Sequence, residues 1–493
     1  MFRLICWSLG LLLATINMGE AKSDTRRVIV VPGVMGSKLC DQPERVIWGD
    51  RSSYVAGRVN ALRLPPDVEQ RNKAIENCGL IESINLIPLL WESNVYNSLL
   101  SFLKDLGYKP ENITIFDYDW RLSNFKNADR LKSTIDRVAP NGKVDIVAHS
   151  MGGIIARIYY QSLGGNAKVQ NLIMLGTPHL GSAKIFERLK DGFEHWPNSL
   201  SGGISEIQKT ILSFPSTYQL LPTYAECCAF STGGDESTAE YKDVLDIETW
   251  TRFSWLPVDF KTGPYAKALS AHLEEARKLR ELFLHPISTN LDEWTRIFYI
   301  ANGFVDTWSR VFFDSATGNV VGKTLKPGDG TVLLFSATGG VPDRMKVALR
   351  PHETIFTAPE AQLLMTATLS NRRWTSDVVS FDQKIIDKHG VKYAVHSGAL
   401  DVMPRVISPG QALDLVLTLE GDDLLSKADL SNLRIELFSG ETALSSFSME
   451  VGPETGKMRS LRKRIQVPVE PGPYGIRLMN LESLEAYFAV IAP

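Results

Sequence analysis

V-D-I-V-A-H-S-M-G-G, residues 144–153, has a residue order typical of a strand, a sharp turn and a helix. Its first four residues are rich in β-branched side chains, which favours a short buried strand. After Ser150, apolar residues recur at helical spacing from Ile154 to Tyr159. The serine therefore stands between a strand and a helix, as the pattern G-x-S-x-G requires, with Ala148 in place of the first glycine.

The composition of the 493-residue chain is that of a globular protein with room for two or three domains. Its net charge of -3 provides no electrostatic attraction for nucleic acid, so nucleic-acid binding is not expected. His, Cys and carboxylate residues show no metal-ligand spacing, and we expect neither a metal nor another cofactor.

The N-terminus has the features of a secretory signal peptide. Arg3 supplies positive charge, residues 4–18 are almost all apolar, and G-E-A at residues 19–21 fits a small-x-small cleavage site. The apolar run is shorter than the about 20 residues of a membrane span. We expect a signal peptide over residues 1–21 and a secreted or periplasmic protein, with an uncleaved anchor as the alternative.

Four cysteines follow the predicted signal peptide, and an exported chain allows them to form disulfides. Cys40 and Cys78 lie in one irregular segment and are the expected pair. Cys227 and Cys228 are adjacent, and the sequence leaves open whether they are free or joined in a strained bridge.

Strands and helices alternate along the first part of the chain, which predicts a mostly parallel sheet with right-handed crossovers. The apolar run V-I-V-V at residues 28–31 fits a strand buried on both faces. Further strands are expected near residues 112–120, 144–149, 171–175 and 296–300. An aromatic-rich segment from about 183 to 290 interrupts the alternation. We interpret it as a cap inserted over the sheet, with a separate helical domain as the alternative.

The residue pattern changes again after about residue 391. Apolar residues alternate with other residues in short runs, and Gly and Pro separate the runs. Such runs at regular spacing predict an antiparallel sandwich. We therefore expect an α/β domain over residues 22–390 that contains the cap, followed by an all-β, immunoglobulin-like sandwich over residues 395–493.

The chain also contains the partners that a nucleophilic serine needs. A serine hydroxyl reacts when a histidine removes its proton and an acid holds that histidine in one tautomer. In α/β hydrolases these residues follow in the chain order Ser, then Asp or Glu, then His. Ser150, Asp329 and His352 have this order. Asp306 is the alternative acid.

Two backbone N–H groups are expected to bind the oxyanion that forms when such a serine attacks an ester. The loop P-G-V-M-G-S, residues 32–37, follows the first predicted strand, and its glycines allow the backbone to approach a substrate closely. Val34 in this loop and Met151 after the serine are the candidate donors. The predicted reaction is acyl transfer through an acyl-Ser150 intermediate to water or an alcohol.

Four strings together resemble the lecithin:cholesterol acyltransferase family, which also includes lysosomal phospholipase A2 and phospholipid:diacylglycerol acyltransferases. They are V-V-P-G-V-M-G-S at 30–37, F-D-Y-D-W-R at 116–121, A-H-S-M-G-G at 148–153 and G-D-G-T-V at 328–332. The Y-D-W-R string is the most telling, because generic hydrolases lack it. The resemblance spans about residues 28–370 and implies an α/β-hydrolase fold.

This resemblance implies the same five residues: Ser150, Asp329 and His352 as the triad, with Val34 and Met151 as the oxyanion donors. It further implies a phospholipid or other lipid ester substrate, met at a membrane or lipid surface.

Two other segments bear on the resemblance. It implies that Trp48 and the loop between Cys40 and Cys78 form a mobile lid against lipid. The string G-T-P-H-L-G-S at residues 176–182 is more typical of bacterial lipases and leaves the acyl acceptor, water or an alcohol, open.

Three functions are weighed on this basis. The first is an O-acyltransferase or phospholipase A-type enzyme, and the second is a secreted triacylglycerol lipase or carboxylesterase. The third is a catalytically inert protein that binds a surface through its sandwich. Release of lysolipid from liposomes separates the first two, and labelling of Ser150 by a fluorophosphonate tests the third.

Overall fold

The structure is a computed structural model of the chain. The predicted signal peptide, residues 1–21, lies outside the residues that it describes. Those residues are 27–42, 45–49, 58–67, 75–81, 84–87, 91–93, 96–191, 204–287, 296–339, 345–369, 378–386, 389, 392–403, 406–407, 410, 412–421, 430–439, 442–455, 458–468, 470, 472–479 and 485–490.

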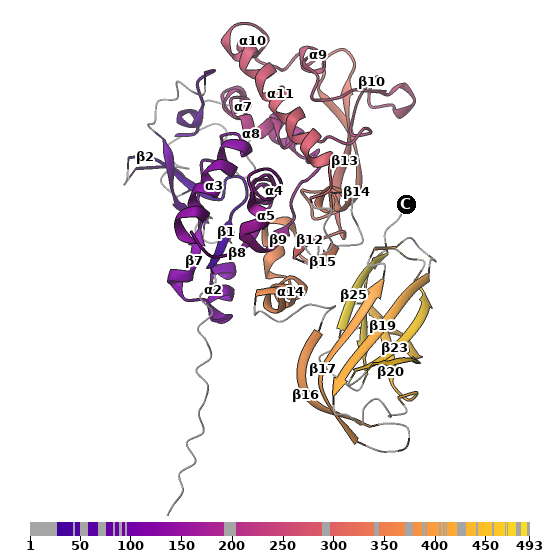
Figure 1. Ribbon diagram of the computed structural model, residues 1–493. Coiled ribbons are helices and arrows are strands. Elements are labelled where there is room, and N and C mark those ends of the chain that lie inside the picture. Colours follow the sequence, from indigo (N-terminus) through magenta and orange to yellow (C-terminus); the bar gives the residue numbers. More distant parts are fainter. Residues whose placement is uncertain are drawn as a thin grey trace, which may run out of the picture.

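A six-stranded sheet forms the centre of the first domain, in the order β15-β12-β9-β8-β1-β7 (Figure 1). All of its neighbouring strands are parallel. The strands are β1 (Arg27–Val31), β7 (Ile113–Ile115), β8 (Val144–His149), β9 (Val169–Leu175), β12 (Ile297–Ala301) and β15 (Met345–Val347). The predicted mixed α/β fold with a mostly parallel sheet is confirmed.

Helices cover both faces of this sheet because successive side chains of a strand point to opposite faces. Ile29 and Val31 of β1 pack in one hydrophobic cluster with α3 and α4. Val28 and Val30 pack in another with α2 and α14. The helices are α2 (Asn97–Asp105), α3 (Asn124–Val138), α4 (Met151–Ser162) and α14 (Pro359–Leu369). None of the described helices has the length and apolar character to cross a membrane.

The strand expected over residues 112–120 is shorter than predicted. It is β7, Ile113–Ile115, and the string F-D-Y-D-W-R that follows it is a loop. Side chains of this loop make buried hydrogen bonds with other segments. The Tyr118 hydroxyl donates to the Pro32 carbonyl, and the Trp120 indole N–H donates to the backbone carbonyl of Ser37. These tertiary contacts end the strand at a point that local sequence preference does not show.

Arg121 and Asp119 of this loop form a buried ion pair. Arg121 Nε and Nη2 donate to the two carboxylate oxygens at 2.9 and 2.8 Å, and both side chains are at most 2% exposed. The guanidinium also donates to the carbonyl oxygens of Leu62 and Ile75. The loop thereby fixes Leu62 and Ile75 to the α/β core.

Leu62 and Ile75 lie in the chain between β3 and β4 of a small antiparallel sheet in the order β3-β2-β4. Its elements are β2 (Ser37–Gln42), β3 (Arg45–Trp48), the 3-10 helix η1 (Arg58–Leu62) and β4 (Glu76–Leu80), and a hairpin of β5 (Ile84–Ile87) and β6 (Trp91–Ser93) follows. A disulfide joins Cys40 to Cys78, with a Cα–Cα distance of 5.9 Å. A second disulfide joins Cys227 to Cys228, the pair that the sequence left open.

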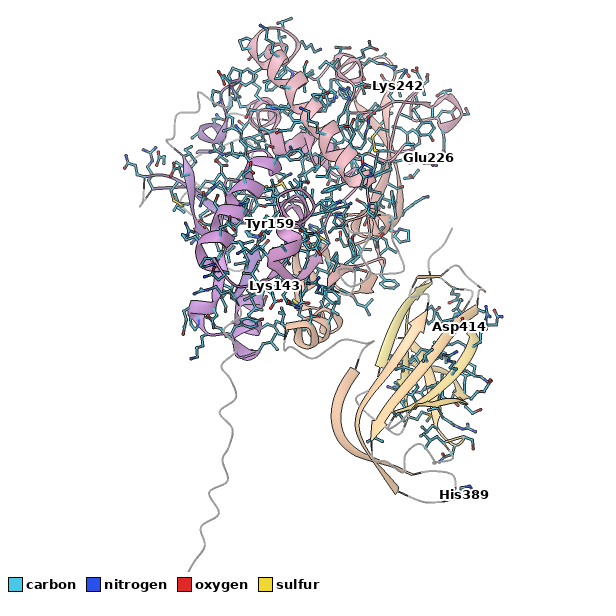
Figure 2. The ribbon with its side chains drawn as sticks, in the orientation of Figure 1. Lys143, Tyr159, Glu226, Lys242, His389 and Asp414 are labelled. Carbon is cyan, nitrogen blue, oxygen red and sulfur yellow. A yellow bond between two sulfur atoms is a disulfide. The ribbon has the colours of Figure 1, made fainter. Side chains whose placement is uncertain are left out.

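Between β9 and β12 the chain forms a layer of helices and contributes β10 and β11 to a second sheet, in the order β11-β10-β13-β14. Glu226 and Lys242, labelled in Figure 2, lie just before β10 and just after β11 of this sheet. Its strands β13 and β14 follow β12, so the layer uses residues on both sides of the cap boundary expected near 290. The elements are α6 (Ile185–Asp191), α7 (Ile204–Leu212), α8 (Pro215–Tyr218), β10 (Cys228–Ser231), β11 (Glu240–Tyr241), α9 (Ile247–Thr251), α10 (Val258–Lys261), α11 (Pro264–Leu284), β13 (Val305–Asp314) and β14 (Val320–Gly328).

The C-terminal region consists of two five-stranded sheets, as the alternating pattern predicts. All strand pairs are antiparallel except the short β18 with β25. One sheet contains β16 (Val378–Ile386), β17 (Lys392–Met403), β19 (Ala412–Gly421), β23 (Met458–Gln466) and β22 (Glu450–Thr455). The other contains β18 (Val406–Ile407), β25 (Glu485–Val490), β24 (Gly472–Leu478), β20 (Arg434–Ser439) and β21 (Thr442–Ser448).

The alternating leucines of β19 account for the packing of this region. Leu413, Leu415 and Leu417 are fully buried in one cluster with Ile435 of the other sheet. The first strand of the region, β16, begins at Val378 and therefore earlier than the expected boundary at 395, because it pairs with β17.

We expect Arg121→Met to lower the free energy of unfolding by about 3–5 kcal/mol, because it leaves the Asp119 carboxylate buried without its cation. The matched control is Lys132→Met, which removes the cation of an exposed ion pair with Asp136. Since exposed pairs contribute little, the control should unfold at nearly the wild-type urea concentration. Equal urea midpoints for the two variants would contradict the structural role of the buried pair.

Candidate active site

Ser150 occupies the sharp turn between β8 and α4. Its backbone has φ 53° and ψ -127°, a left-handed conformation that is rare for a residue with a Cβ. Its N–H donates to the Leu175 carbonyl at 2.8 Å, which ties the turn to the neighbouring strand β9. Gly152 is required two residues later, because an added Cβ there would lie 2.4 Å from the Pro32 carbonyl oxygen.

The side chains of Ser150, His352 and Asp329 meet in one buried chain of hydrogen bonds. His352 Nε2 lies 2.9 Å from Ser150 Oγ, and His352 Nδ1 lies 2.7 Å from Asp329 Oδ2. The exposed fractions are 6% for Ser150, 6% for His352 and 1% for Asp329. The three residues that the chain order predicts therefore lie far apart in the sequence but are in contact in the structure.

Backbone contacts fix the acid and the histidine relative to each other. Asp329 directly follows β14, and its Oδ1 accepts hydrogen bonds from the N–H groups of Thr331 and Val332. His352 begins the 3-10 helix η7 (His352–Thr357), and its own N–H donates to the Asp329 carbonyl at 3.0 Å. Asp306, the alternative acid, is exposed on β13, and none of the described contacts joins it to His352.

The electrostatic environment of His352 raises its pKa, so the imidazole binds a proton more readily than it does in water. Burial by itself would lower the pKa of His352, but the Asp329 carboxylate and its hydrogen bond raise that pKa above its ordinary value. An imidazole held in this way has Nδ1–H directed at the carboxylate and Nε2 directed at the serine hydroxyl. It is arranged to accept the hydroxyl proton.

The loop after β1 passes directly beside Ser150. A Cβ added at Gly33 would lie 3.0 Å from Ser150 Cβ, so a side chain there would require Ser150 to shift by a few tenths of an ångström. Among the described residues, no acceptor is paired with the N–H of Val34 or of Met151. These two N–H groups belong to the segments on either side of the serine, and both are available to an oxyanion.

Trp48 has a different place from the one that the resemblance implies. It is 3% exposed, its ring packs edge-on against Trp120, and its indole N–H donates to the Met35 carbonyl at 3.0 Å. In this conformation the indole does not face a lipid surface. It instead holds the loop that carries Val34.

Two residues near the serine were not singled out by the sequence pattern. The Tyr96 hydroxyl lies 2.9 Å from His149 Nδ1, and His149 Nε2 lies 2.9 Å from the His352 carbonyl oxygen. Position beside Ser150 was the only sequence signal for His149, and Tyr96 showed only the helical apolar spacing that it shares with Leu99 and Leu100. No described group of three or more His, Cys, Asp or Glu side chains has an arrangement that would hold a metal ion.

The parallel sheet with a serine at the strand–helix turn and a histidine at its side defines an α/β hydrolase. The chain is similar to the lecithin:cholesterol acyltransferase family, whose model matches residues 48–259. It is thus an α/β-hydrolase-fold acyltransferase or lipid acyl hydrolase that acts on lipid esters. The matched region contains Ser150 and ends before Asp329 and His352.

Three solved structures are among those to which the chain shows some similarity. The Tle4-Tli4 complex gives a TM-score of 0.47 at 12% identity, over 71% of this chain and 98% of that one. Lipase BlEst2 of Bacillus licheniformis gives 0.33 at 12%, over 96% and 75%. Phospholipase PlaB of Legionella pneumophila gives 0.22 at 10%, over 94% and 91%. At these scores the assignment rests on the family match alone.

Gly176 provides a test of how closely the site is packed. Its φ is 58°, and an added Cβ would lie 3.0 Å from Asp329 Oδ2 and 3.1 Å from His352 Nδ1. We expect Gly176→Ala to displace the imidazole and to slow labelling of Ser150 by a fluorophosphonate on the order of 10²-fold.

The matched control for this prediction is Gly164→Ala. Gly164 also has a positive φ, 82°, but an added Cβ there meets no heavy atom within 4 Å. Both variants should lose roughly 1–2 kcal/mol of stability from the left-handed backbone. Only Gly176→Ala should lose reactivity, and equal labelling rates would show that Asp329 and His352 are not confined by Gly176.

Proposed function

We propose that the protein transfers an acyl group from a lipid ester through a covalent acyl-Ser150 intermediate. The observation that carries this proposal is the hydrogen-bonded chain Ser150–His352–Asp329, with heavy-atom distances of 2.9 and 2.7 Å. These distances lie within the range over which a base takes a proton from a nucleophile.

In the first half of the reaction, Ser150 Oγ attacks the ester carbonyl carbon while His352 Nε2 takes the hydroxyl proton. Asp329 stabilises the imidazolium that results. As the tetrahedral intermediate collapses, the bond to the alcohol breaks, and His352 returns the proton to the leaving oxygen. The acyl group stays on Ser150 as an ester.

In the second half, water or an alcohol attacks the acyl-Ser150 ester, and His352 takes the proton of the attacking oxygen. Ser150 leaves with that proton restored. Water gives a free fatty acid, and an alcohol gives a new ester. The same residues thus serve a phospholipase A-type enzyme and an O-acyltransferase.

The oxyanion of both intermediates is bound by the N–H groups of Val34 and Met151. Each such donor is typically worth about 10²–10³ in rate. Their lack of other described acceptors and the closeness of Gly33 to Ser150 support this role.

We propose a glycerophospholipid as the ester donor, since the family match points to a lipid-acting enzyme of this kind. Such a substrate is presented at a membrane or lipid surface. The apolar stretch at residues 4–18 supports a secreted or periplasmic location for the reaction.

Replacement of Asp329 by Asn should lower kcat/KM on the order of 10⁴-fold, because the amide no longer holds the histidine in the required tautomer. In the wild type, kcat/KM should fall as the pH drops below the raised pKa of His352, where the base becomes protonated. The variant retains burial and loses the carboxylate, so this acidic limb should move to lower pH.

The control for this prediction is Asp306→Asn, which removes an exposed carboxylate that does not touch His352. It should leave both the rate and the acidic limb unchanged. A near-normal rate for Asp329→Asn together with a large loss for Asp306→Asn would transfer the acid role to Asp306.

Mass spectrometry of the products should identify the reaction. Vesicles of phosphatidylcholine that contain a long-chain alcohol are incubated with the wild type and with Ser150→Ala. We expect the wild type to release lysophospholipid together with fatty acid, a new ester, or both, and the variant to release none. Wild-type hydrolysis of tributyrin without lysophospholipid would instead favour a lipase or carboxylesterase.

A further inference from the structure

Two buried polar side chains lie beside Ser150 and take no part in the proposed reaction steps. Tyr96 precedes α2 and is 1% exposed, and His149 ends β8 and is 6% exposed. A buried polar group is stable only when its hydrogen bonds are made, so their partners show what these two side chains do.

The partners of Tyr96 and His149 lie on the two sides of the site. The Gly33 N–H donates to the Tyr96 oxygen at 2.7 Å, and that oxygen lies 2.9 Å from His149 Nδ1. On the other side of the ring, His149 Nε2 lies 2.9 Å from the His352 carbonyl oxygen. An unbroken chain of three hydrogen bonds therefore connects the loop of Val34 to the backbone of His352.

The donors and acceptors of this chain fit together in only one way. A carbonyl only accepts, so His149 carries its proton on Nε2 and donates to His352. Nδ1 is then an acceptor and receives the single Tyr96 O–H. The tyrosine oxygen in turn accepts from Gly33. Burial lowers the pKa of His149 to about 3, so the neutral ring that this pattern needs is present at ordinary pH.

Ring packing keeps the chain rigid. Phe356, four residues after His352, stacks on Tyr96 with ring centroids 5.7 Å apart and meets His149 edge-on at 5.6 Å. Tyr96, His149 and Phe356 thus form one aromatic cluster between the loop and η7. A shift of either end would require this cluster to repack.

We propose that Tyr96 and His149 are positioning residues that hold the Val34 loop at a fixed distance from His352. This inference rests on the proposed function, since it assigns the loop its part in oxyanion binding. Without the chain, the Gly33 N–H loses its acceptor, and the adjacent Val34 N–H is free to move away from the developing oxyanion. Substrate binding before attack does not use this N–H, so the effect falls on kcat rather than on KM.

The test compares Tyr96→Phe with Tyr218→Phe. Each substitution removes one buried phenol hydroxyl. The Tyr218 hydroxyl donates to the Leu212 carbonyl at 2.7 Å, in the layer of helices between β9 and β12. With p-nitrophenyl octanoate as substrate, Tyr96→Phe should lower kcat about tenfold with little change in KM, which is less than the loss of a whole oxyanion donor. Tyr218→Phe should leave kcat unchanged.

A second readout separates misplaced oxyanion donors from general damage to the fold. In the thionoester analogue, sulfur replaces the carbonyl oxygen and is a weaker hydrogen-bond acceptor, so turnover depends less on well-placed donors. The ratio of ester to thionoester kcat should therefore fall about tenfold in Tyr96→Phe. A merely structural loss lowers both rates and leaves this ratio unchanged.

A third variant tests whether the two residues act through one chain. His149→Gln retains an N–H for the His352 carbonyl and loses the ring that receives the Tyr96 hydroxyl. The double variant should be no slower than the slower single variant, since both substitutions break the same connection. If Tyr96→Phe fails to fold, the ester-to-thionoester ratio of His149→Gln decides alone.

The outcomes distinguish this inference from the proposed function. A wild type that turns over and is labelled at Ser150, with an unchanged kcat and ratio in Tyr96→Phe, overturns the positioning role and leaves the function intact. Multiplicative losses in the double variant also overturn it. A wild type with no labelling and no turnover would instead reject the proposed function.

Discussion

The strained backbone of Ser150 is the constraint on which the rest of the site depends. A left-handed conformation at a residue with a Cβ is unfavourable, and it persists only where surrounding contacts over-determine it. Here β8 leads into the turn, the Leu175 carbonyl accepts the serine N–H, and Gly152 allows α4 to begin against the loop after β1. The hydroxyl is thereby directed at His352 rather than into the helix.

The principal elements of this arrangement were predictable from the sequence because they depend on local pattern and on chain order. The apolar run at residues 28–31 predicts β1, and V-D-I-V-A-H predicts β8. The order Ser150, Asp329, His352 selects three side chains that the structure brings into contact. Alternating leucines, such as those of β19, predict the C-terminal sheets.

Features that depend on contacts between distant segments were not predictable in this way. β7 ends at Ile115 because the following side chains bond to β2 and to the loop after β1. Trp48 is buried because Met35 supplies an acceptor for its indole. The local pattern at Tyr96 indicates an apolar helix face and no polar role. Its role depends on Gly33 and His149, which are brought together only by the completed sheet.

The place of Asp329 has a consequence for how this enzyme can diverge. Asp329 follows β14, and β14 pairs with β13. β13 in turn pairs with β10, which lies between β9 and β12 in the chain. Ser150, in contrast, is carried by the parallel sheet. The position of the Asp329 carboxylate therefore depends on the packing of the sheet that contains β10, β13 and β14. A chimera that exchanges the segment between β9 and β12 alone would separate β10 from its partner strand, so a transplant with preserved turnover must extend through β14.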